Sequence, residues 1–126
     1  MSGSYYVSAN EAQGARWEFT ADDLMSATSE LRPDATVSAP SGPHGTIEIL
    51  LPGEQGDDSV LYHSGEPVLV FRERDDLEAP AALVLHLLQR LAPNVNTVWF
   101  ADFEGVPHPL DLSSSVDDFV DELTSE

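Results

Sequence analysis

The chain has 126 residues, contains no cysteine and carries 23 acidic against five basic side chains, for a formal net charge of −18. The absence of cysteine excludes disulfides and thiolate metal sites. Every base is an arginine, which also excludes a lysine-dependent phosphate-binding loop. Charge of this sign argues against direct binding to free nucleic acid or to an anionic membrane, and it favours basic partners, cations or simple solubility. A GC-rich genome or a saline cytoplasm is an alternative explanation of the acidic composition. At this length we expect a single domain over residues 1–126.

The first strand and the first helix are predicted from short patterns near the start. Residues 4–8 alternate weakly and predict a strand, and Trp17 and Phe19 lie two apart, as on one face of a strand. Thr20 and Asp23 have the spacing of a capping box and predict the start of a helix, which the Arg-Pro pair ends.

Short turns separate the strands predicted in the middle of the chain. Apolar residues alternate with polar ones most clearly at Ile47 and Ile49, which share one face. The last two strands flank a three-residue turn that is typical of a hairpin. The predicted strands cover residues 35–38, 46–51, 60–63 and 67–74.

A helix is predicted over residues 79–91, which begin with the longest apolar run, residues 79–88. Most of its circumference is expected to be core, with His86, Gln89 and Arg90 pointing outward. A strand is predicted over residues 97–103, followed by a rigid, proline-rich connection. The final helix is predicted from an apolar stripe at helical spacing, formed by Val116, Phe119, Val120 and Leu123.

Consecutive strands joined by short turns favour a mostly antiparallel sheet. The fold class we expect is therefore α+β, with five or six strands in the sheet and about three helices packed on it. The first residues lack the basic and apolar regions of a signal peptide, and no apolar run has the length of a membrane span. These features predict a cytoplasmic protein.

One local cluster has the residue types of a metal or acid–base site. Asp102, Glu104, His108 and Asp111 fall within ten residues at the end of a predicted buried strand. Carboxylates and an imidazole can bind a divalent cation or transfer protons. The spacing matches no known metal-binding loop, and no catalytic or cofactor motif occurs elsewhere, so no cofactor is expected.

Acidic residues on the predicted helices form the other candidate site. Such rows of carboxylates complement a basic protein surface and speed encounter with it. The last helix presents Asp117, Asp118, Asp121 and Glu122, and the first presents Asp22, Asp23 and Glu30. Immunity proteins that block basic nuclease toxins and nucleic-acid mimics share this composition and size, although no motif assigns the chain to a family.

We therefore expect a non-enzymatic protein-binding module, of immunity or inhibitor type in its sharpest form, that engages a basic partner. Two alternatives stay open. The first is a small metal-binding protein or hydrolase that uses Asp102, Glu104, His108 and Asp111. The second is a structural or oligomerisation module with Trp99 or Phe119 at a subunit interface.

Overall fold

A computed structural model of the chain describes residues 4–43, 45–52, 58–65, 67–72, 77–101 and 106–124. Its seven strands form one antiparallel sheet in the order β2-β3-β4-β5-β1-β6-β7, which confirms the predicted α+β class with more strands than expected. The strands are β1 (Ser4–Ala9), β2 (Thr36–Val37), β3 (Thr46–Leu51), β4 (Asp58–His63), β5 (Val68–Arg72), β6 (Thr97–Ala101) and β7 (His108–Leu110).

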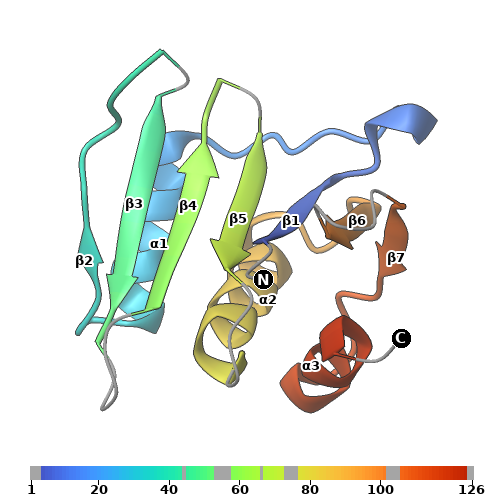
Figure 1. The fold of residues 1–126 in the computed structure, drawn as a ribbon. Helices are drawn as coiled ribbons and strands as arrows, with labels where there is room; N and C mark the ends of the chain where they lie inside the picture. The colour runs from blue at the N-terminus through green and yellow to red at the C-terminus, as the bar shows by residue number, and fades with distance from the viewer. Residues whose placement is uncertain are drawn as a thin grey trace.

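The helices form a second layer on one face of the sheet, behind the strands in Figure 1. They are α1 (Ala21–Leu31), α2 (Glu78–Leu91) and α3 (Val116–Thr124), and a short 3-10 helix, η1 (Glu11–Gln13), follows β1. Helix α2 lies between α1 and α3 and contacts both. Because of this arrangement, α2 is the central support of the helical layer.

Helix α2 buries most of its surface, as its sequence predicts. Most of its circumference is buried, and His86, Gln89 and Arg90 are exposed on one narrow stripe. Pro80 lies in the first turn, where the absence of its N–H costs no hydrogen bond. The buried residues are Pro80, Ala81, Leu83, Val84, Leu85, Leu87 and Leu88.

Helix α1 begins with the predicted capping box. The Asp23 amide donates to Thr20 Oγ1 (3.1 Å), and the Thr20 amide donates to Asp23 Oδ2 (3.0 Å). These bonds satisfy two backbone donors that helix geometry leaves without partners. Leu24 and Ala27 turn inward to the core.

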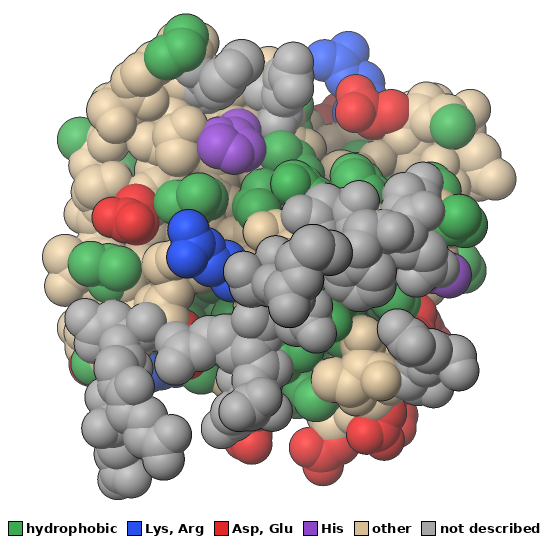
Figure 2. All heavy atoms as spheres, viewed as in Figure 1, with side chains coloured by type: hydrophobic (Ala, Val, Ile, Leu, Met, Phe, Trp, Pro, Cys, Tyr) green, Lys and Arg blue, Asp and Glu red, His purple; other side chains and the backbone are tan. Residues whose placement is uncertain are grey.

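The sheet alternates buried and partly exposed side chains along β1. Tyr5, Val7 and Ala9 face the helices and are buried, whereas Tyr6 faces the other way and stacks on Phe100, with ring centroids 5.1 Å apart. Figure 2 shows hydrophobic side chains gathered on this second face. The period of two along the strand therefore separates the core face from the outer face.

Two predictions about local structure are wrong. Trp17 and Phe19 lie outside the sheet, in the segment that links η1 to α1. The two rings instead lie 5.5 Å apart, and Phe19 packs 5.7 Å from Tyr62. Within the predicted proline-rich connection, residues 108–110 form the edge strand β7. Proline is tolerated there because one edge of β7 pairs with no other strand of the described chain.

Candidate functional site

The surface of α3 is set by how the helix docks. Phe119 and Leu123 are buried against the core, and the Tyr5 hydroxyl donates to the Leu123 carbonyl (3.2 Å). The outward side then carries three exposed carboxylates from Asp117, Asp118 and Asp121, which we call the α3 acidic face. Burial of two apolar anchors fixes the direction in which these carboxylates point.

The α3 acidic face has no compensating positive charge within ion-pair distance among the described residues. Two of the four described arginines form ion pairs elsewhere in the chain: Arg90 with Glu30, and Arg32 with Asp34 at 3.0 Å. In Figure 2, acidic side chains are visible along the lower edge, where Figure 1 places α3. Three like charges on one short helix therefore face solvent unneutralised by the described chain.

Glu122, the fourth acid predicted to bind a partner, instead makes an intramolecular contact. Its Oε1 atom accepts a hydrogen bond of 2.6 Å from the Trp99 indole N–H on β6. Trp99 is buried, so this bond satisfies a donor that water does not reach freely. The carboxylate of Glu122 thus ties α3 to the sheet.

The cluster predicted from residues 102–111 is described only in its second half, because Asp102 and Glu104 lie outside the described residues. His108 stacks on Trp99, with ring centroids 4.6 Å apart. Asp111 accepts hydrogen bonds from the Ser113 hydroxyl (2.6 Å) and amide (2.9 Å), and these bonds lower the pKa of its carboxyl.

The sheet register separates Asp111 from the far end of β6. Leu110 pairs with Thr97, so Asp111 follows at the end of β6 opposite to Ala101. No group of three histidine, aspartate or glutamate side chains suited to a metal ion occurs among the described residues. The cluster as a whole stays a prediction.

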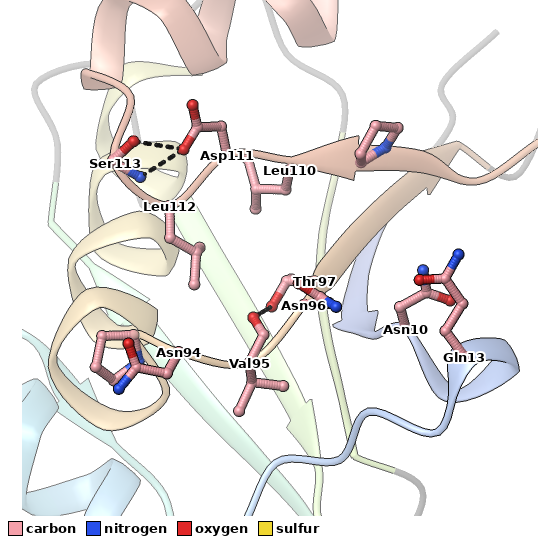
Figure 3. A pocket seen from close by; sticks show the side chains of 12 residues that line it. Asn10, Gln13, Asn94, Val95, Asn96, Thr97, Leu110, Asp111, Leu112 and Ser113 are labelled. Carbon is pink, nitrogen blue, oxygen red and sulfur yellow. Dashed lines mark hydrogen bonds between the residues drawn. The ribbon is translucent and has the colours of Figure 1, made fainter.

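An open groove of about 510 Å³ lies at the end of the sheet where Asp111 is found. In Figure 3, Asn10 and Gln13 form one wall, the segment with Asp111 forms the opposite wall, and residues 95–97 lie between them. Sequence reasoning missed this groove because its walls are far apart in the chain. The order of the strands, which local patterns do not encode, brings them together.

Two further expectations bear on alternative functions. Trp99 and Phe119 are 4% and 0% exposed, so neither can supply the exposed interface of the predicted oligomerisation module. Among the described residues, no helix has the length and apolar character required to cross a membrane.

Comparison with known proteins gives no assignment: no family model matches the chain, and no curated protein or solved structure is significantly similar to it.

Proposed function

We propose that this chain is a non-enzymatic protein-binding module that engages a basic protein through the α3 acidic face. The observation that carries the proposal is that Asp117, Asp118 and Asp121 are exposed on a docked helix without ion-pair partners among the described residues. Carboxylates held in place in this way attract a cationic surface and set its orientation on contact.

Two physical points support a rigid recognition surface. The apolar anchors of α3 and the Trp99–Glu122 hydrogen bond hold the helix against the sheet, so its acids are presented in one arrangement. Binding then costs less conformational entropy than it does for carboxylates on a flexible tail. A net charge of −18 extends the attraction beyond direct contact.

The sharpest version of the proposal is an immunity-type or inhibitor protein that covers the cationic site of a toxin or enzyme. A basic site that binds nucleic acid would be complementary to the α3 acidic face in the same way as to phosphates. The composition and size of the chain fit this role, and the partner would be a protein with a cationic surface.

A capture experiment with two matched variants tests the proposal. The chain is immobilised through its N-terminus, and proteins retained from native lysate are quantified at about 50 mM and 500 mM NaCl, a range that strongly shortens the screening length. One variant carries Asp117→Asn, Asp118→Asn and Asp121→Asn. The control removes the same charge from exposed sites off α3 through Glu18→Gln, Asp22→Asn and Glu48→Gln.

We expect a basic protein to be retained at low salt by the parent chain and by the control, and to be lost from the α3 variant. Equal loss from both variants would mean that net charge, and not the α3 acidic face, governs capture. Retention of the same proteins by the α3 variant would contradict the proposal outright.

A further inference from the structure

The groove at the end of the sheet is built where three neighbouring strands start or finish. β1 ends before Asn10, β6 begins just after Asn96, and β7 ends before Asp111. Because these strands are antiparallel neighbours, the three positions share one end of the sheet. The backbone N–H of Asn10 donates to the backbone carbonyl of Asn96 (2.8 Å), and this bond holds two of these segments together.

Carboxamide side chains are the common feature of the lining. Four of them come from two of these segments, and none of the four side chains forms a hydrogen bond with the described chain. Each carboxamide presents two N–H donors and one carbonyl acceptor. The four residues are Asn10, Gln13, Asn94 and Asn96.

The charge and the residue types of the lining limit the chemical class of the ligand. Asp111 is the one ionisable side chain that lines the groove in the described chain, so an anionic ligand is disfavoured and a cation is tolerated. The lining has no aromatic ring on which a nucleobase could stack. Apolar side chains such as Val95 and Leu112 can contact small aliphatic groups.

We propose that this groove binds an extended peptide segment that is neutral or carries a basic side chain. The C=O groups of a peptide backbone can accept hydrogen bonds from the carboxamide NH₂ groups, and its N–H groups can donate to the carboxamide oxygens. The wall that contains Asp111 leads within a few residues into α3. The inference rests on the proposed function for the source of the peptide, which would be a segment of the basic partner next to its contact with the α3 acidic face.

The test uses blocked tripeptides with N-acetyl and C-amide ends as probes, followed in nitrogen–proton correlation spectra of the ¹⁵N-labelled full chain. The probes carry alanine, lysine or glutamate at the centre between two alanines. Side-chain NH₂ signals of the four groove carboxamides report contact directly. The NH₂ signal of Gln89 is an internal reference, because this carboxamide already donates to the Leu112 carbonyl at the edge of the groove.

We expect the alanine and lysine probes to shift the four groove signals. The glutamate probe should bind about threefold more weakly than the lysine probe, because the two differ by two unit charges that water and salt screen strongly from Asp111. The paired variant Asn10→Ala and Asn96→Ala should keep its melting temperature and lose these shifts. Absence of groove shifts with all three probes would overturn the inference. So would unchanged shifts in the paired variant, or tighter binding of a methyl glucoside than of any peptide.

The α3 variant separates this inference from the proposed function. With Asp117, Asp118 and Asp121 replaced by asparagine, the alanine probe should still shift the groove signals, because the probe has no charge. Groove binding in a chain that captures no basic protein would overturn the proposed function and support this inference. Capture of a basic protein by a chain whose groove signals do not shift with any probe would support the proposed function and overturn this inference.

Discussion

Helices α1 and α3 are both acidic and both pack against α2, yet their carboxylates have different partners. Asp23 completes the capping box of α1, and Glu30 pairs with Arg90 of α2. Just beyond α1, Arg32 lowers the pKa of the Asp34 carboxyl. None of the three acids of the α3 acidic face has such a contact in the described chain, whereas on α1 only Asp22 lacks one. Helix α3 therefore leaves more of its carboxylates unpaired.

Removal of the apolar anchor of α3 should have the largest effect. Phe119 is 0% exposed, and Phe119→Ala should lower the free energy of unfolding by about 3–5 kcal/mol through lost burial and the cavity that remains. Leu24→Ala, the matched change on α1, should cost a comparable amount. Denaturant unfolding measures both. A cost below about 1 kcal/mol for Phe119→Ala alone would mean that α3 is loosely held and presents no fixed surface.

The two tryptophans offer a second, smaller contrast. Both are buried, but the Trp99 indole donates to Glu122, whereas the Trp17 indole N–H has no hydrogen-bond partner in the described chain. Trp99→Phe should therefore cost about 1.5 kcal/mol more than Trp17→Phe, because it alone removes a bond to a charged acceptor. Equal costs in denaturant unfolding would show that Glu122 does not stabilise the docking of α3.

The N-caps of α1 and α3 should contribute different, smaller amounts to the free energy of unfolding. Thr20→Ala should cost about 1 kcal/mol by removing the capping box of α1. Ser115→Ala should cost less, because the Ser115 hydroxyl accepts a single hydrogen bond from the Asp118 backbone amide (3.2 Å), whereas Thr20 belongs to a reciprocal pair of bonds. Thermal unfolding of both variants checks the order. The reverse order would contradict the account of α1 as the helix whose polar groups are committed to structure.

Sequence patterns were informative wherever a signal is local. The capping box at Thr20, the core face of α2 and the outward position of His86 all follow from residue spacing within one helix. Patterns failed where partners are distant in the chain. Nothing near Trp99 indicates that Glu122 accepts its N–H, and Asn10 has no local feature that places it beside Asn96. Strand order decides these contacts, and hydrophobic periodicity does not encode it.

The smallest expected change is a stabilisation of α3 at the expense of binding. Asp121→Lys would place a cation four residues after Asp117, where opposite charges on a helix attract, and should add about 0.5 kcal/mol to the free energy of unfolding. Asp121→Asn, which removes the repulsion without adding a cation, should give a smaller gain. Loss of basic-protein capture by the more stable Asp121→Lys chain would sharpen the contrast with α1, where Asp23 and Glu30 make structural contacts. Destabilisation by Asp121→Lys would instead show that this carboxylate has a structural partner.

The central claim is that the α3 acidic face concentrates negative charge that the described chain leaves unneutralised. Relaxation of assigned amide and side-chain protons by soluble cationic and neutral paramagnetic molecules reports the local electrostatic potential without a binding partner. We predict that the excess relaxation by the cationic molecule is greatest at residues 117–121 and weaker at residues 21–30, where Arg90 offsets the charge of Glu30. An equal excess on both helices would contradict the claim, because charge would then be spread over the surface without a preferred face.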